Sequence, residues 1–200
     1  MYLLLDIGNT REKAALVKNG KVTALPQLAP DNLALLPIKA VYYASVASQE
    51  KVAVIKQLLG LDHLPWRQVH ADAQAYGVRS SYQQPQTLGV DRWLAMLGAQ
   101  LLFPTESVLI IDAGTAVTVD WVDHEGQHGG GWIIPGLKMQ QQAVVKNTAK
   151  VFNSEMFNGR LEPGTDTVTG LQNGCLAAVL GAIRLAWQQS PCSKLLLTGG

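Results

Sequence analysis

The sequence has few of the residues that mark metal-binding, nucleic-acid-binding and membrane proteins. Its 200 residues include two cysteines, Cys175 and Cys192, which lack any metal-ligand spacing. We therefore expect both to be reduced thiols of a cytoplasmic protein. The formal net charge is +1 and no long basic run occurs. The sequence thus offers no electrostatic footprint for nucleic acid.

Long apolar runs are also missing. Three leucines precede Asp6, which is too few for a signal peptide or an anchor. Residues 176–183 form an apolar run that Gly181 interrupts, and this run is far too short to span a bilayer. We expect no membrane partner. With 48% hydrophobic residues, the chain can bury a good core, as one large domain or as two lobes.

Two common nucleotide-binding motifs are absent as well. No Gly-x-x-x-x-Gly-Lys-Ser/Thr occurs, which excludes a P-loop, and no Gly-x-Gly-x-x-Gly opens a helix. The four histidines are scattered, and we assign none of them to a metal. The tryptophans are expected to be packing residues: Trp66, Trp93, Trp121, Trp132 and Trp187.

Two stretches of the chain are built alike, LLLDIGNT at residues 3–10 and LIIDAGTA at residues 109–116. In each, an apolar run ends in a carboxylate, Asp6 or Asp112, and a glycine follows two positions later. This order, followed by a turn signal at Asn19-Gly20 in one copy and at residues 123–126 in the other, indicates a buried strand, a tight turn and then the second strand of a β-hairpin. A single Asp-x-Gly is often only a turn. Its repetition favours a duplicated domain with a cleft between the copies.

Such a cleft would contain two carboxylates, two glycine turns with backbone N–H donors, and the hydroxyls of Thr10 and Thr115. These groups suit a phosphate chain and its cation.

The predicted elements divide the chain into a first lobe, 1–104, and a second lobe, 105–200. After the first hairpin we expect strands at 21–25, 40–46 and 66–69, and helices at 49–59 and 92–102. Ser48 is the expected N-cap of the first helix and Gly60 its stop. In the second lobe we expect strands at 108–111, 116–122, 131–134 and 194–198, and helices at 137–149 and 168–188.

The predicted fold class is α/β, or α+β by a strict definition of layers. In the first lobe a helix, a strand and a second helix follow the fourth strand. The second lobe stops at its fourth strand, so we expect it to be short at the C-terminus.

In these motifs the chain resembles the type III pantothenate kinases, members of the actin-like ATPase and sugar-kinase superfamily. The resemblance covers essentially the whole chain and rests on four motifs in order: DIGNT at 6–10, GVDR at 89–92, DAGTAVT at 112–118 and GGWIIPG at 130–136. The last three residues, 198–200 (TGG), are similar to the start of the family's adenosine-side motif.

The resemblance implies duplicated ribonuclease H-like lobes, as in actin-like ATPases, with a cleft between them. It also implies phosphorylation of pantothenate by ATP to 4'-phosphopantothenate, the first step of coenzyme A biosynthesis. The expected assembly is a homodimer with the acceptor site near the subunit interface. A monovalent cation, K⁺ or NH₄⁺, is expected beside Mg²⁺.

The resemblance implies that the segment from Asp6 to Lys13 is the first phosphate loop. Its members are Asp6, Ile7, Gly8, Asn9, Thr10, Arg11, Glu12 and Lys13. Backbone N–H groups with Asn9 and Thr10 would hold phosphate oxygens, and Asp6 would position Mg²⁺ through water. Lys13 would add positive charge, or it would be an ordinary exposed lysine on the outer face of the hairpin.

In the second copy, the resemblance makes Asp112 the ligand of the monovalent cation and Thr115 a further contact of the ATP phosphates. A carboxylate in a turn rich in carbonyl oxygens is chemically suited to a hard cation.

The resemblance assigns the acceptor end to residues 89–92, in which Gly89, Val90, Asp91 and Arg92 would line the pantothenate site. Asp91 would be the catalytic residue that takes the proton from the attacking hydroxyl. The fork of Arg92 suits a carboxylate. Alternatively, Asp91 caps the helix that follows and Arg92 lies in solvent.

Tyr82 and Thr167 resemble the remaining pantothenate contacts. Thr167 could equally be the N-cap of the next helix, and Thr165 or Thr169 could take its place.

Two further functions stay open. A fold does not determine an activity, so the chain could be a catalytically silent, ATP-binding regulatory or accessory protein. It could also be a kinase for another small hydroxy acid or sugar.

Overall fold

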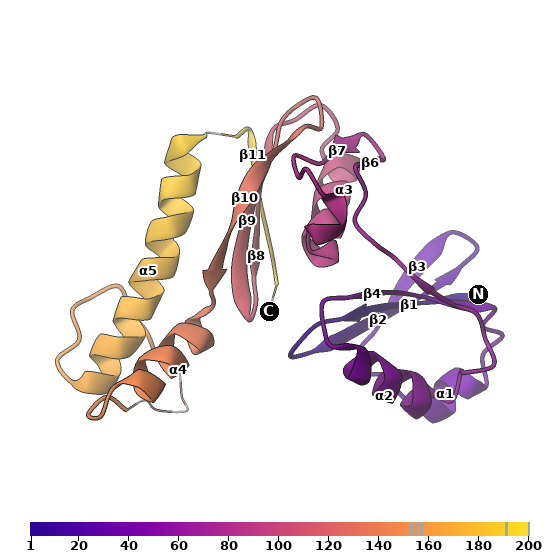
Figure 1. The fold of residues 1–200 in the computed structure, drawn as a ribbon, viewed down its shortest axis with the longest axis horizontal. Helices are drawn as coiled ribbons and strands as arrows, with labels where there is room; N and C mark the ends of the chain where they lie inside the picture. Colours follow the sequence, from indigo (N-terminus) through magenta and orange to yellow (C-terminus); the bar gives the residue numbers. More distant parts are fainter. Residues whose placement is uncertain (153, 155, 157, 191, 200) are drawn as a thin grey trace. The chain divides into compact units, whose positions relative to one another are not determined.

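The computed structural model describes residues 1–200 except 153, 155, 157, 191 and 200 (Figure 1). It contains two compact units. The first comprises Met1–Asp72 and Gln84–Leu94, and the second comprises Ala73–Gln83 and Ala95–Gly200. The predicted lobes, 1–104 and 105–200, have other limits, and that division stays a prediction. Gly200, the last residue of the predicted adenosine-side motif, lies outside the described residues.

The first unit is built on a five-stranded sheet in the order β3-β2-β1-β4-β5. Its strands are β1 (Tyr2–Ile7), β2 (Glu12–Lys18), β3 (Lys21–Leu25), β4 (Ala40–Ser45) and β5 (Trp66–Gln68). β1 pairs antiparallel with β2 and parallel with β4. Between β2 and β3, Asn19 and Gly20 have φ values of 50° and 76°. Two positive φ angles are typical of a type I′ hairpin turn, which here joins β2 to β3. The predicted first hairpin is the antiparallel β1–β2 pair, and it is confirmed.

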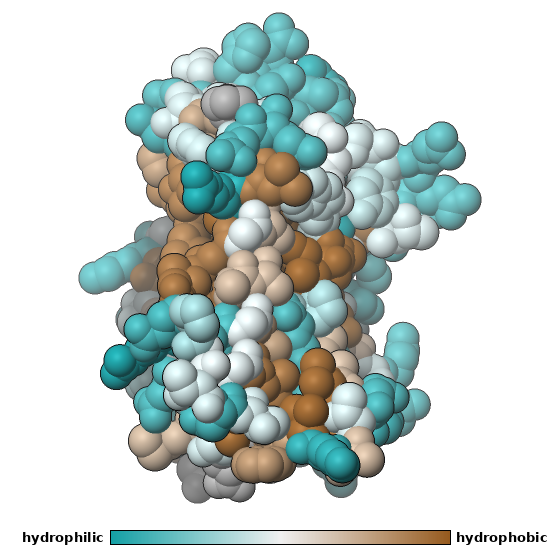
Figure 2. All heavy atoms as spheres, turned by 90° about the vertical axis from the view of Figure 1, so that its left-hand side faces the viewer, coloured by the Kyte–Doolittle hydropathy of each residue, from teal (hydrophilic) through white to brown (hydrophobic). Residues whose placement is uncertain are grey.

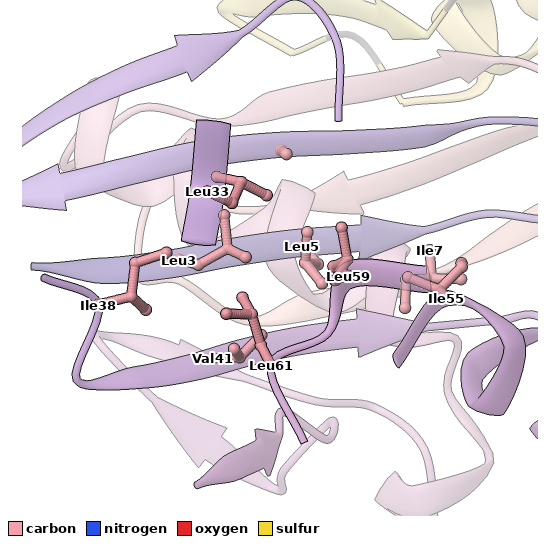
Figure 3. Packing of buried hydrophobic residues seen from close by; sticks show 10 residues of the cluster. Leu3, Leu5, Ile7, Leu33, Ile38, Val41, Ile55, Leu59 and Leu61 are labelled. Atoms are coloured by element: carbon pink, nitrogen blue, oxygen red, sulfur yellow. The ribbon is translucent and has the colours of Figure 1, made fainter. Parts of the chain in front are cut away.

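The core of this unit lies between the sheet and two helices, α1 (Pro30–Ala34) and α2 (Gln49–Leu59). Leu3, Leu5 and Ile7 alternate along β1 and are buried, so they face this core. Figure 3 shows them packed with Ile55 and Leu59 of α2. The residues between them, Leu4 and Asp6, therefore lie on the face of the sheet away from the helices.

Helix α2 has both of its predicted ends. The Ser48 side chain accepts a hydrogen bond from the Lys51 amide (3.3 Å), and Gly60 ends the helix with φ of 61°. Four short elements were not predicted: α1, the 3₁₀ turn η1 (Pro85–Thr87), and the paired strands β6 (Gln74–Ala75) and β7 (Val78–Arg79). Each is too short to show a recognisable hydrophobic period.

The second unit is built on a four-stranded sheet in the order β10-β9-β8-β11. Its strands are β8 (Val108–Ala113), β9 (Ala116–Val122), β10 (His128–Pro135) and β11 (Lys194–Gly199). β8 pairs antiparallel with β9 and parallel with β11. The order therefore corresponds to that of β3-β2-β1-β4 in the first unit.

Two helices follow the meander of the second unit, α4 (Leu137–Asn147) and α5 (Thr167–Gln189). Val179 and Ala186 of α5 pack with Leu109, Ile111 and Val119 of the sheet. Helix α4 ends two residues earlier than predicted, and Thr148 after it is extended.

Among the described residues, α5 is the one helix whose length and apolar composition would allow it to cross a membrane. The same properties occur in helices of soluble proteins. One side of α5 covers the sheet of its own unit. The fold itself thus accounts for part of its apolar composition.

The tryptophans are packing residues with one exception. Trp93 is buried, Trp66 packs against the first core, and Trp121 contacts Trp132 edge to face at 5.1 Å. The prediction is wrong for Trp187, which is 38% exposed. Both cysteines are free, as predicted.

Candidate active site

The first predicted phosphate turn connects β1 to β2. Asp6 is the last but one residue of β1, and residues 8–11 form the turn. The Gly8 amide donates a hydrogen bond to the Arg11 carbonyl oxygen (3.0 Å). A Cβ atom at Gly8 would also lie 3.0 Å from this oxygen. The tight closure of the turn thus favours glycine at this position.

Asp6 and Lys13 are direct partners in the β1–β2 pair. Side chains of directly opposed residues lie on the same face of a sheet. Lys13 therefore lies with Asp6 on the face away from α1 and α2, and both side chains are exposed there. This arrangement is compatible with either of the roles considered for Lys13.

The second turn is shorter than the first. Only Gly114 and Thr115 separate β8 from β9, against four residues between β1 and β2. The Gly136 amide donates a hydrogen bond to the Thr115 carbonyl oxygen (3.0 Å). This bond ties the start of α4 to the turn.

Asp112 has the place in β8 that Asp6 has in β1. Its direct partners are Thr118 on β9 and Thr198 on β11. The carboxylate therefore lies between two threonines on one face of the sheet. Carboxylate and hydroxyl oxygens are the donor set that hard cations prefer.

The acceptor motif begins helix α3 (Val90–Leu102). Because the helix already includes Val90, Asp91 lies in its first turn and the alternative of an N-cap at Asp91 is wrong. Arg92 is only 4% exposed, so the alternative of an arginine in solvent is wrong too. The Arg92 amide donates to Asp91 Oδ1 (2.8 Å).

Steric crowding explains why glycine occupies position 89 of this motif. A Cβ atom there would lie 2.6 Å from Asp91 Oδ1. Real Cβ atoms essentially never approach a heavy atom so closely. The carboxylate of Asp91 therefore occupies space that exists only because residue 89 has no side chain.

A cavity of about 230 Å³ lies within the first unit. It is lined by Ser45 and Val46, by residues 68–71 and by residues 86–90, which include Gly89 and Val90. Ser45 is also the direct partner of Ile7, the last residue of β1. Through Ser45, the end of β1 that leads into the first phosphate turn thus lies beside the cavity that Gly89 and Val90 line, at the carboxyl edge of one sheet, where ligands of open α/β sheets bind. Residues 8–11, Asp91 and Arg92 are not among its lining residues.

Tyr82 has a partner that the sequence did not suggest. Its ring stacks on His128 at 6.0 Å between centroids and 18° between planes. His128 Nε2 lies 3.0 Å from Asp120 Oδ1, and His128 Nδ1 lies 3.2 Å from Ser81 Oγ. The side chains of His128 and Asp120 are buried. The sequence spacing of Asp120 and His128 does not indicate this pairing, because the two residues lie on different strands, β9 and β10.

The threonines near 167 differ in their environment. Asp166 is the N-cap of α5, so the alternative of a cap at Thr167 is wrong. The Thr169 amide donates to Asp166 Oδ1 (2.9 Å), and Thr169 completes a capping box. These hydrogen bonds from the Thr169 amide and hydroxyl lower the pKa of the Asp166 carboxyl. The capping role of the Thr169 hydroxyl leaves Thr165 and Thr167 as the better substrate candidates.

Lys51 of α2 is a further residue at the first turn, and no sequence motif includes it. Its ammonium donates to the carbonyl oxygens of Gly8 (2.8 Å) and Asn9 (3.1 Å), and it pairs with Glu12 Oε1 at 2.7 Å. A positively charged residue so early in a helix was the available signal, because lysine is unfavourable there.

The fold has a clear counterpart among solved structures. A crystal structure of a Baf family protein from Campylobacter jejuni aligns with 99% of this chain and 83% of its own, with a TM-score of 0.57 and 23% identity. At this identity the likeness concerns the fold alone. It defines the chain as a mixed α/β protein of that fold.

Sequence comparison defines the family. The model of the type III pantothenate kinase family matches residues 2–189. A type III pantothenate kinase of Colwellia psychrerythraea is 38% identical over all of this chain and 85% of its own length. Those of Pseudoalteromonas translucida and Acinetobacter baylyi are each 34% identical, over 100% and 99% of this chain and 85% of their own lengths. The chain belongs to the type III pantothenate kinase family.

Proposed function

We propose that this protein transfers the γ-phosphate of ATP to the hydroxyl of pantothenate. The product is 4'-phosphopantothenate, and the reaction begins coenzyme A biosynthesis. Family membership supports this substrate and this reaction. The structural observation that supports it most is the position of Ser45, which pairs with the last residue of β1 before the first phosphate turn and also lines the cavity bordered by Gly89 and Val90.

Phosphoryl transfer requires chiefly the alignment of two substrates and the neutralisation of charge. We assign the nucleotide phosphates to the turn that follows Asp6 and to Thr115. In this proposal Lys13 adds positive charge on the Asp6 face of the sheet. The cavity of about 230 Å³ beside this turn would receive the acceptor.

We assign the acceptor to Gly89, Val90, Asp91 and Arg92, with Tyr82 and Thr167 as further contacts. Asp91 would accept the proton of the attacking hydroxyl as its oxygen approaches the γ-phosphate. Arg92 would pair with the pantothenate carboxylate through its planar fork. The burial of Arg92 fits this role, since a buried guanidinium is stabilised by such pairing.

Mg²⁺ would neutralise the phosphate charge. Among the residues that the structure describes, no three His, Cys, Asp or Glu side chains form a metal-binding group. Mg²⁺ usually keeps several waters and binds through one or two carboxylates plus substrate phosphates. One carboxylate, Asp6, acting through water, therefore suffices for this ion.

The monovalent cation is assigned to Asp112, and this leads to a prediction. Asp112→Asn should raise the potassium concentration for half-maximal activation by roughly 10-fold or more, the scale on which changes near a metal ligand are felt. The substitution is nearly isosteric, so the melting temperature should change little. Asp123→Asn, in the turn after β9, is the matched control. Unchanged potassium dependence in Asp112→Asn would remove the assignment.

We also propose a homodimer formed through α4 and α5. Exposed apolar side chains gather on these helices: Met139, Val144, Leu180, Leu185 and Trp187. Figure 2, which views this side of the second unit, shows apolar residues across the middle of the face. A groove between the two helices, lined by residues such as Met139, Val144 and Leu171, has a volume of about 630 Å³. Such a patch is typical of protein–protein contacts.

Light scattering should therefore give twice the chain mass of 21.6 kDa. Leu185→Asp should give the monomer mass, because it places a charge on the exposed apolar face. A monomeric unmodified protein contradicts this assembly.

The sheets support the proposed duplication, because the first four strands of both follow one order. We therefore propose two actin-like ATPase lobes, 1–104 and 105–200. The free cysteines are consistent with a location in the cytoplasm.

The proposed reaction is tested directly with ATP, Mg²⁺ and pantothenate. Mass spectrometry should detect phosphopantothenate and ADP in equal amounts, and omission of Mg²⁺ should abolish both. The alternative outcome is that the protein binds ATP but phosphorylates neither pantothenate nor any of a panel of other hydroxy acids and sugars. That result would identify an ATP-binding regulatory protein.

A further inference from the structure

Lys51 stands at a position of α2 where its charge is locally unfavourable. Ser48 is the N-cap and Lys51 the third helical residue. The N-terminus of a helix carries a partial positive charge, and a capping box has Glu or Gln at this third position. Local conflicts of this kind are expected where a residue has a tertiary or functional role.

The tertiary role is visible in the contacts of the Lys51 ammonium. Its three acceptors are the carbonyl oxygens of Gly8 and Asn9 and the Glu12 carboxylate. A lysine ammonium has three N–H donors. All three are thus used, and the negative charge of Glu12 balances that of Lys51. In this arrangement the donors of the side chain are directed at the turn and at Glu12, which favours an effect on a nucleotide through the turn.

The geometry of the peptide group determines what this contact does. A peptide is planar and trans, so its N–H points opposite to its C=O. The carbonyls of Gly8 and Asn9 converge on Lys51. The N–H groups of the same two peptides, which belong to Asn9 and Thr10, therefore point away from α2. Successive N–H groups that point to one side form a concave anion site.

The side of the turn away from α2 also carries the charged residues assigned to Mg²⁺ and to the nucleotide phosphates. Leu5 and Ile7 face the helices, whereas Asp6 and its cross-strand partner Lys13 lie on the opposite face. Glu12, opposite Ile7, lies on the helix face and reaches Lys51. The Gly8 and Asn9 carbonyl groups thus face α2, whereas the amide groups of the same peptides face the side on which Asp6 and Lys13 lie.

We infer that Lys51 is a positioning residue that holds the 8–11 turn so that the Asn9 and Thr10 amides face the nucleotide phosphates. Glu12 anchors Lys51 and does not contact ATP. This inference rests on the proposed function and deepens it. Because it concerns nucleotide binding alone, it can fail while phosphorylation of pantothenate stands, and the reverse also holds.

Calorimetric titration with an ATP analogue tests the inference. Lys51→Met should weaken nucleotide binding roughly 10-fold, the effect of losing charge-assisted hydrogen bonds, and leave the KM for pantothenate within about 2-fold. Lys51→Arg keeps the charge and several donors and should restore most of the affinity. Lys56→Met is the matched control. It removes a lysine from the same helix, but this lysine contacts the Trp66 ring instead of the carbonyl groups of the turn.

Glu12→Gln distinguishes positioning from direct contact. If Lys51 acts through the turn, loss of its anchor should weaken nucleotide binding about 3-fold. If Lys51 binds phosphate itself, its release from Glu12 should strengthen that binding, and the inference is overturned. Unchanged nucleotide affinity in both Lys51→Met and Glu12→Gln overturns it as well. Should Lys51→Met not fold, the sign of the Glu12→Gln effect decides alone.

Discussion

Asp91→Asn is expected to lower turnover by roughly 10²-fold or more while pantothenate still binds. An amide cannot accept the proton of the attacking hydroxyl, and this is the role we assign to Asp91. The Asn side-chain oxygen can still accept the Arg92 amide, which Asp91 Oδ1 accepts now at 2.8 Å. Loss of a negative charge from the first helical turn costs no more than about 1 kcal/mol. The melting temperature should therefore fall only slightly.

Initial rates and calorimetric binding on one preparation decide the role of Asp91. Glu50→Gln is the matched control, since it removes a carboxylate from the first turn of α2. Near-normal turnover in Asp91→Asn would leave Asp91 with a structural role and would transfer the search for the base to Asp6 and Asp112. Gly89→Ala is a companion test, because its methyl group would displace the Asp91 carboxylate. It should reduce turnover without removing the carboxylate.

Gly136→Ala is expected to damage the second phosphate turn. A Cβ atom at Gly136 would collide with the carbonyl oxygens of Gly114 and Thr115. These are backbone atoms and cannot rotate away, so the cost should be about 1–3 kcal/mol, as for other overpacked sites. At this chain length the melting temperature should fall by roughly 3–10 °C. Nucleotide affinity should fall as well, because the turn that carries Thr115 must move.

Gly98→Ala is the control for this experiment. Gly98 lies inside α3, and a Cβ atom there would meet nothing within 4 Å. Alanine is favoured over glycine in a helix by roughly 0.5–1 kcal/mol, so this variant should be slightly more stable. Thermal unfolding and nucleotide titration of both variants give the comparison. Equal behaviour of the two would show that Gly136 has no special role in the turn.

The sequence was most informative where the signal lies within a few neighbouring residues. Asn19 and Gly20 specified a hairpin turn because both tolerate positive φ. Ser48 and Gly60 specified the ends of α2, since a side-chain acceptor suits the first turn and a left-handed residue suits the last. The two strands that end in Asp-x-Gly were recognised in the same way. All of these are local preferences of the chain.

The sequence was less informative about which helical position a residue takes. Asp91 satisfied the chemistry of an N-cap, but α3 begins at Val90 and places it inside the first turn. Thr167 was an equally good cap, yet Asp166 takes that place and Thr169 completes the capping box. A shift of one residue changes which group is free for a substrate. Propensities of neighbouring polar residues are too similar to decide such a shift.

By itself, then, the sequence determined the hairpins, the ends of α2 and the motifs that carry the family resemblance, because each depends on adjacent residues. Only the tertiary structure decided that Lys51 holds the Gly8 and Asn9 carbonyls, that His128 pairs with Asp120 behind Tyr82, and that Asp91 fills the space left by Gly89. Two of these contacts join separate elements, and the third depends on the exact start of a helix. Packing selects such contacts from many that the chain could make, and no local pattern encodes that selection.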